Sequence, residues 1–116
     1  MFATELARRY GVHDVAAVSR RVADIDEAAE LMQRLRAAPP AGLAGFAATV
    51  TDITDALIFT GGDDQTSIRV VVRPSGTEPK LKCYLEIRCA PAHDLSRARA
   101  RAATLRAQLL ATVENW

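Results

Sequence analysis

The stretch SIRVVVRPSGTEPKLKCYLEIRC, residues 67–89, decides the fold because it contains two strand-like runs joined by a short loop. In the first run, Ile68, Val70 and Val72 alternate with Arg69, Val71 and Arg73. In the second run every other residue is apolar: Leu81, Cys83, Leu85, Ile87 and Cys89. This two-residue period predicts neighbouring strands of an antiparallel sheet that is buried on one face.

The segments on either side predict two helices and two further strands. Asp24 and Glu27 resemble a capping box in front of the apolar positions Ala28, Leu31, Met32 and Leu35, and Pro39–Pro40 ends that helix. The segments FAATVTDI (46–53) and DALIFT (55–60) read as strands. A second long helix begins at Leu95, where Asp94 can cap it.

Two segments near the N-terminus are less regular. Thr4–Tyr10 has helical character and meets Gly11, and residues 11–24 alternate only loosely, so that they can contain a strand. The predicted fold is therefore α+β, with a roughly four-stranded antiparallel sheet and two helices packed on one of its faces in two layers.

Length and charge limit the kinds of partner. A chain of 116 residues, 49% of them hydrophobic, is the size of one domain with a real core. Its net charge of +1 gives no overall attraction to nucleic acid or membranes. The arginines of the last helix lie mostly off its apolar stripe and lack aromatic neighbours, so a solvated helix face is expected there. MFATELARRYGV, residues 1–12, has no signal-peptide core, and we expect a cytoplasmic protein.

The two cysteines, Cys83 and Cys89, lie on one predicted strand and on the same apolar face. Six residues of extended chain separate their Cα atoms by about 20 Å, whereas a disulfide requires about 7 Å or less. We therefore expect two reduced thiols in the core.

The loop RPSGTEPK, residues 73–80, gathers groups that can donate hydrogen bonds to an anion. Arg73 offers a planar fork, Ser75 and Thr77 offer hydroxyls, Gly76 permits a positive φ that would turn backbone N–H groups into one concavity, and Lys80 offers an ammonium group. Glu78 does not fit this set and is expected to point away from an anion, towards Arg73 or Lys80. The loop is a candidate phosphate site, and the alternative is a surface turn made of ordinary turn residues.

The segment VVVRPSGTEPKLKCYLEI, residues 70–87, closely resembles the phosphate-binding loop and flanking strands of the α-D-phosphohexomutase family, which contains phosphoglucomutases and phosphomannomutases. LARRYG and LRAAPPAGLAGFAATVTDI are also similar to that family's C-terminal region. The resemblance implies the last of four domains, with a TATA-binding-protein-like fold. It places the end of the preceding domain's closing helix at residues 1–12 and the phosphate-binding domain at residues 13–116.

By the same resemblance, the loop holds the phosphate that is not transferred, through Arg73, Ser75, Gly76, Thr77 and Lys80. The other features of the family are absent from the sequence: neither His13 nor His93 follows a serine as the nucleophile motif requires, and no closely spaced aspartate triplet ending in arginine provides a magnesium loop. The resemblance thus implies a fragment without catalytic or metal-binding residues, inactive alone. Mg²⁺, the other three domains and the sugar phosphate belong to the parent enzyme.

The alternatives are a stand-alone sugar-phosphate-binding or regulatory module, and an interaction domain whose turn only resembles the motif. The sequence does not distinguish mannose, glucose, glucosamine and pentose phosphates as the ligand, because the family's sugar-reading glutamate–serine–glycine loop is missing from it.

Overall fold

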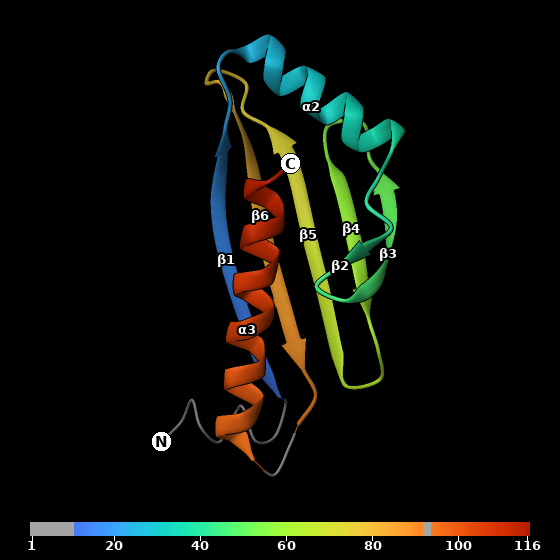
Figure 1. Ribbon diagram of the computed structural model, residues 1–116, viewed down its shortest axis with the longest axis vertical. Coiled ribbons are helices and arrows are strands. Elements are labelled where there is room, and N and C mark those ends of the chain that lie inside the picture. Colours follow the sequence, from blue (N-terminus) through green and yellow to red (C-terminus); the bar gives the residue numbers. More distant parts are fainter. Residues whose placement is uncertain (1–10, 92–93) are drawn as a thin grey trace.

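The computed structural model describes residues 11–91 and 94–116, which form an α+β fold (Figure 1). The elements in chain order are β1 (Val12–Arg21), α2 (Ile25–Ala37), β2 (Gly42–Leu43), β3 (Phe46–Asp52), β4 (Leu57–Gly62), β5 (Thr66–Pro74), β6 (Lys80–Cys89) and α3 (Leu95–Glu114). The helix predicted for Thr4–Tyr10 lies outside the described residues. No helix in the described ranges is both long and apolar enough to cross a membrane.

The strands form one antiparallel sheet in the order β1-β6-β5-β4-β3-β2. Val72 pairs with Cys83 and Pro74 pairs with Leu81, so β5 and β6 face each other up to the loop of residues 75–79. The α+β class and the antiparallel sheet predicted from the sequence are confirmed. The predicted number of about four strands is wrong, because the described residues form a sheet of six strands.

The two additional strands are β1 and β2, and each lacks a clear sequence signal for a physical reason. β2 has only two residues. β1 does alternate, but its half-buried face contains Asp14 and Arg20 beside valine and alanine. Both charges have partners there: Asp14 accepts hydrogen bonds from Arg106 of α3 at 2.9 and 2.8 Å, and Arg20 donates to the backbone carbonyl of Trp116 at 2.6 Å. These contacts allow charged residues on a face that sequence reasoning expects to be apolar.

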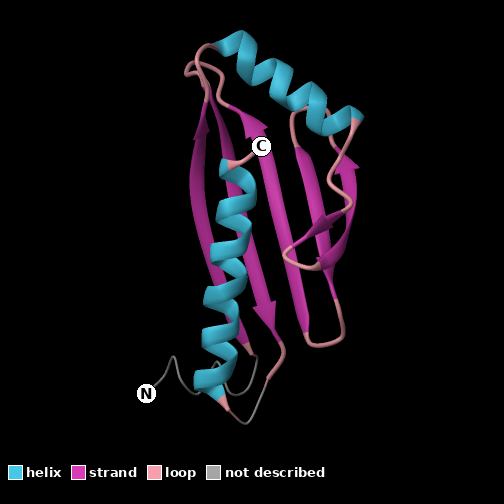
Figure 2. Ribbon diagram, in the orientation of Figure 1, coloured by secondary structure: helices cyan, strands magenta, loops and turns pink. Residues whose placement is uncertain are grey.

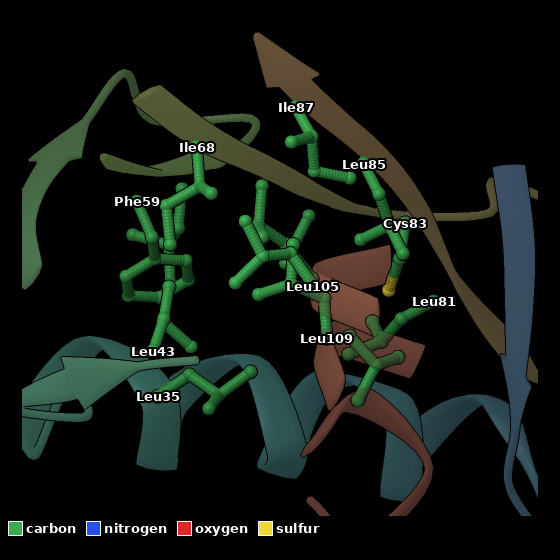
Figure 3. Packing of buried hydrophobic residues seen from close by; sticks show 14 of the residues in the cluster. Leu35, Leu43, Phe59, Ile68, Leu81, Cys83, Leu85, Ile87, Leu105 and Leu109 are labelled. Atoms are coloured by element: carbon green, nitrogen blue, oxygen red, sulfur yellow. The ribbon is translucent and has the colours of Figure 1, made fainter. Parts of the chain in front are cut away.

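The core lies between one face of the sheet and the two helices (Figure 2). α3 runs along β1 and β6, while α2 crosses one end of the sheet and contacts β5 and β6. Figure 3 shows Leu85 and Ile87 of β6, Leu35 of α2 and Leu109 of α3 in one cluster of buried side chains. Phe59 of β4 belongs to the same cluster and is fully buried, and its ring centroid lies 5.7 Å from that of Trp116.

Both predicted helix starts are confirmed. The Asp24 carboxylate accepts from the Glu27 amide at 2.8 Å, and the Glu27 carboxylate in return accepts from the Ala23 amide at 2.9 Å. At the start of α3, Asp94 accepts from the Arg97 amide at 3.0 Å. Each cap satisfies amide groups that a helix leaves without an internal partner.

The opposite side of the sheet, called here the open face, is the one from which the two helices are absent (Figure 1). Its side chains on β1, β5 and β6 are the half-exposed or exposed alternate residues: His13, Val15, Ala17, Ser19, Arg21, Ser67, Arg69, Val71, Arg73, Lys80, Lys82, Tyr84, Glu86 and Arg88. The alternation of β5 and β6 therefore directs Arg73 and Lys82 to the same face.

Candidate functional site

The loop that joins β5 and β6 has a fixed backbone conformation that Ser75 closes. The Ser75 amide donates to the Lys80 carbonyl at 3.0 Å, and the Ser75 hydroxyl oxygen accepts from the amides of Thr77 and Glu78 at 3.4 and 3.2 Å. The Pro79 carbonyl accepts from the Val22 amide at 3.0 Å, which ties the loop to the end of β1. The loop is therefore ordered by its own hydrogen bonds, while the proton of the Ser75 hydroxyl remains available to donate.

This arrangement corrects the expected concavity of backbone N–H groups. Thr77 and Glu78 direct their amides to Ser75, although the 3.4 Å contact of Thr77 is at the weak end for a hydrogen bond. Of the four amides of residues 75–78, that of Gly76 alone has no hydrogen-bond partner among the described residues. Side-chain donors, rather than a row of amides, thus form most of the candidate site.

Gly76 also differs from the prediction in its conformation. The glycines with positive φ in the described chain are Gly11, Gly45 and Gly62, so the predicted positive φ at Gly76 is wrong. A Cβ atom built on Gly76 would meet nothing within 4 Å. Neither the backbone nor internal packing requires glycine here. Its effect is to leave the backbone bare, where an anion can approach closely.

The cations around the loop come from both strands. Arg73 is exposed, and Lys82 lies directly opposite it in the β5–β6 register. Neither side chain makes a hydrogen bond or ion pair with the rest of the described chain. Lys80, by contrast, is only 14% exposed, and its Nζ lies 3.5 Å from the Glu78 carboxylate. Arg73 and Lys82 thus form a pair of available donors at one side of the loop.

Sequence reasoning missed Lys82 as a site residue. The signal was present, because the alternation of each strand put Arg73 and Lys82 on the polar faces of their strands. What the sequence lacked was the register, which brings these two positions opposite one another. The five predicted residues lie together on the loop and the adjoining strand ends, with Lys82 as a sixth.

Glu78 points to cations other than Arg73. Its carboxylate lies 3.5 Å from Lys80 Nζ and 3.8 Å from an Arg21 nitrogen, and its side chain is 52% exposed. Ion pairs of this length at an exposed position stabilise the fold only weakly. Their effect is to hold the one carboxylate of the loop beside Lys80 and Arg21.

Charge is unevenly distributed over the surface. The cations of the open face on β1, β5 and β6 are Arg21, Arg69, Arg73, Lys80, Lys82 and Arg88. The carboxylates that contact them are Glu78 and Glu86, and Glu86 lies 3.0 Å from Arg88 and 3.5 Å from His13. A chain with a net charge of +1 therefore presents a basic face beside its loop.

The two cysteines lie in the core as predicted, and both are free thiols. Burial raises the pKa of Cys83 from the ordinary value of 9.0 to about 12, although the nearby Arg20 opposes the shift. Burial likewise raises the pKa of Cys89. Both groups are protonated at neutral pH and are not nucleophiles. Nor do the described residues bring together three His, Cys, Asp or Glu side chains that could hold a metal ion.

Comparison with known proteins identifies the family of the chain. Residues 7–105 match the family model "Phosphoglucomutase/phosphomannomutase, C-terminal domain". A "Probable phosphomannomutase" of Haemophilus influenzae is 37% identical over 106 residues, which cover 83% of the chain. The chain spans 21% of that protein's length. On this evidence the chain belongs to the family of phosphoglucomutase/phosphomannomutase C-terminal domains.

Proposed function

We propose that the chain acts as the phosphate-positioning domain of a phosphohexomutase and that its loop binds the non-transferred phosphate of a sugar phosphate. The binding residues are Arg73, Ser75, Gly76, Thr77 and Lys80, joined by Lys82. Family membership supports the parent activity, an isomerisation by intramolecular phosphoryl transfer. The observation that carries the proposal is the Arg73–Lys82 pair beside an ordered loop with an unobstructed Gly76.

The chemistry of this site is binding and charge neutralisation. A phosphate monoester carries about −1.5 to −2 charges and three strong acceptor oxygens. Arg73 can bind two of these oxygens at once, and Lys82 adds a second positive charge. The Ser75 hydroxyl can donate to an anion while its oxygen keeps two loop amides in place. Ser75 has a structural and ligand-binding role here, since within the described part of the chain its hydroxyl makes hydrogen bonds to backbone amides and to no side chain that could act as a base.

Bond making is assigned to the rest of the parent enzyme. We propose that three preceding domains supply the nucleophilic serine and the Mg²⁺ loop, that residues 1–12 end the helix closing the third of them, and that the enzyme works in the cytoplasm. The contribution of this domain is to hold one phosphate still while the other is transferred, which lowers the barrier by fixing the substrate's orientation. Alone, the chain is expected to be inactive and to bind sugar phosphates with Kd on the order of millimolar.

NMR titration of the ¹⁵N-labelled chain with inorganic phosphate tests the proposal. The amides of Ser75, Gly76 and Thr77 should shift, and Arg73→Ala should weaken binding by about 1.5–3 kcal/mol, the range for a hydrogen bond to a charged group. Arg69→Ala is the matched control, because Arg69 lies on the same strand and face but four residues away from Arg73. Equal weakening in both variants would indicate a general charge effect, and unchanged loop shifts in Arg73→Ala would contradict the proposal.

A further inference from the structure

A hollow of about 510 Å³ lies on the helix side of the sheet, between α3 and the turn that joins β2 to β3. α3 and β2 lie on the same side of the sheet (Figure 1), and the hollow marks the place where they leave the layer above the sheet incomplete. Ala44 contributes to it from the turn, and its polar side chains come from α3: Arg97, Arg101, Thr104 and Gln108. Among the described residues, no carboxylate lines the hollow.

The two arginines of the hollow have guanidinium groups available for a ligand. Within the described part of the chain, the Arg97 side chain makes no hydrogen bond or ion pair. Arg101 uses only its Nε, in a weak contact of 3.4 Å with the Thr66 hydroxyl. The two residues are four positions apart in the helix, so they lie on the same side of α3, about 6 Å apart along its axis. Two guanidinium groups thus line one hollow without a carboxylate partner.

Helix stability does not explain this position of the arginines. α2 has the favourable distribution of charge, with acidic residues in its first turn and basic residues in its last turn. α3 has no acidic residue in its first turn and no basic residue in its last turn, and Arg97 is its third residue. A cation there is repelled by the positive end of the helix dipole and by Arg101 one turn further on. The same place is favourable for a bound anion.

The turn between β2 and β3 adds backbone donors at the edge of the hollow. Leu43 pairs with Phe46, and the two residues between them, Ala44 and Gly45, have φ of 50° and 84°. This is the geometry of a two-residue hairpin turn. The amides of Ala44 and Gly45 have no hydrogen-bond partner among the described residues. Two amides are therefore available beside the arginines.

The number of donors indicates the kind of anion. Each guanidinium group can bind two oxygens, so Arg97 and Arg101 together can bind four. A phosphate monoester has three such oxygens, whereas a diphosphate group has more. Thr104 and Gln108 continue the hollow with a hydroxyl and an amide, which suit an uncharged polar remainder. The volume lies within the roughly 300–1,000 Å³ of small-molecule sites.

We propose that this hollow is a second anion site of the domain and that it binds a diphosphate group through Arg97 and Arg101. The group can be inorganic pyrophosphate or the end of a small organic diphosphate. The site lies on the opposite side of the sheet from Arg73, so that the two sites can be occupied together. Its ligand would join α3 to the β2–β3 turn, and the inference does not depend on phosphate binding by the β5–β6 loop.

NMR titration of the ¹⁵N-labelled chain with inorganic pyrophosphate, at about 0.15 M salt, tests the site. The amides of Ala44, Gly45 and Arg101 should shift, with an affinity about tenfold higher than that for inorganic phosphate, the gain of a further charge-assisted hydrogen bond. Arg73→Ala should leave these shifts unchanged. Adenosine diphosphate distinguishes the two sources of the group, since an organic diphosphate should also shift Gln108.

Variants separate a specific site from general charge attraction. Arg97→Gln should weaken pyrophosphate binding about tenfold. Arg99→Gln is the matched control, because it removes the same charge from an exposed position of the same helix outside the hollow, and it should weaken binding about twofold at most. Without ligand, Arg97→Gln should not lower Tm, since it removes an unfavourable cation from the first turn.

Three results would overturn the inference. Equal weakening in Arg97→Gln and Arg99→Gln would indicate attraction to the whole helix. Equal affinity for phosphate and pyrophosphate at the Ala44 and Gly45 amides would remove the assignment of a diphosphate group. A lower Tm of Arg97→Gln without ligand would give Arg97 a structural role instead.

Discussion

The ion pair between Asp14 and Arg106 should contribute measurably to stability, because it joins α3 to the edge strand β1. One Arg106 nitrogen donates to both carboxylate oxygens of Asp14, at 2.9 and 2.8 Å. The Asp14 side chain is only 17% exposed, while that of Arg106 is 40% exposed. Removing the guanidinium would leave a largely buried carboxylate without its partner, which costs more than the loss of a surface ion pair.

We expect Arg106→Met to lower the free energy of unfolding by about 2 kcal/mol, between the typical values for exposed and fully buried pairs. For a chain of 116 residues this corresponds to a fall in Tm of about 8 °C. Arg99→Met is the control, because Arg99 lies on an exposed position of the same helix. Thermal unfolding followed by circular dichroism measures both variants.

A double-mutant cycle isolates the pair itself. The double variant Asp14→Asn/Arg106→Met should lose less free energy of unfolding than the two single variants lose in sum, because the second change no longer breaks an interaction. A fall in Tm for Arg106→Met no larger than for Arg99→Met would refute the assignment of a stabilising role to this contact.

Three further predictions concern single residues. Gly62→Ala should lower the stability, since Gly62 has φ of +143° and an added Cβ would lie 2.2 Å from the Thr66 carbonyl oxygen; denaturant unfolding measures the loss. Gly76→Ala should leave stability unchanged within about 0.5 kcal/mol, because its surroundings are open, yet weaken phosphate binding in the NMR titration. Cys83 should resist iodoacetamide at pH 8 until the chain is unfolded, and stability should fall as pH rises from about 9 towards its raised pKa of about 12, because the unfolded chain loses the thiol proton first. Labelling of native Cys83 at the rate of unfolded chain would contradict this pKa.

The parts of the fold with strong periodicity were predictable from the sequence. β5 and β6 have one apolar face each, and both helix starts have an acidic cap, so that local chemistry determines their type. β1 was less predictable because Asp14 and Arg20 occupy its half-buried face, and their partners, Arg106 and Trp116, lie more than 90 residues away in the chain. A single sequence contains no signal for such distant pairing.

The candidate site, too, was predictable from the sequence only in part. The loop residues were identifiable because turn residues and anion donors occur together between two strands. The backbone conformation of the loop could not be predicted. The Ser75 hydroxyl oxygen accepts hydrogen bonds from two loop amides, and this removes the need for a positive φ at Gly76. Lys82 was also missed, because its proximity to Arg73 follows from the register of β5 and β6 rather than from its place in the chain.

A crystal structure of the chain with glucose 6-phosphate would test the central proposal most directly. The phosphate should lie within hydrogen-bond distance of the Arg73 guanidinium, the Ser75 hydroxyl and the Gly76 amide. A hollow lined by Arg97 and Arg101 of α3, on the helix side of the sheet, is a competing position for the phosphate. Phosphate bound at α3, with the loop of residues 75–79 vacant, would contradict the proposed function.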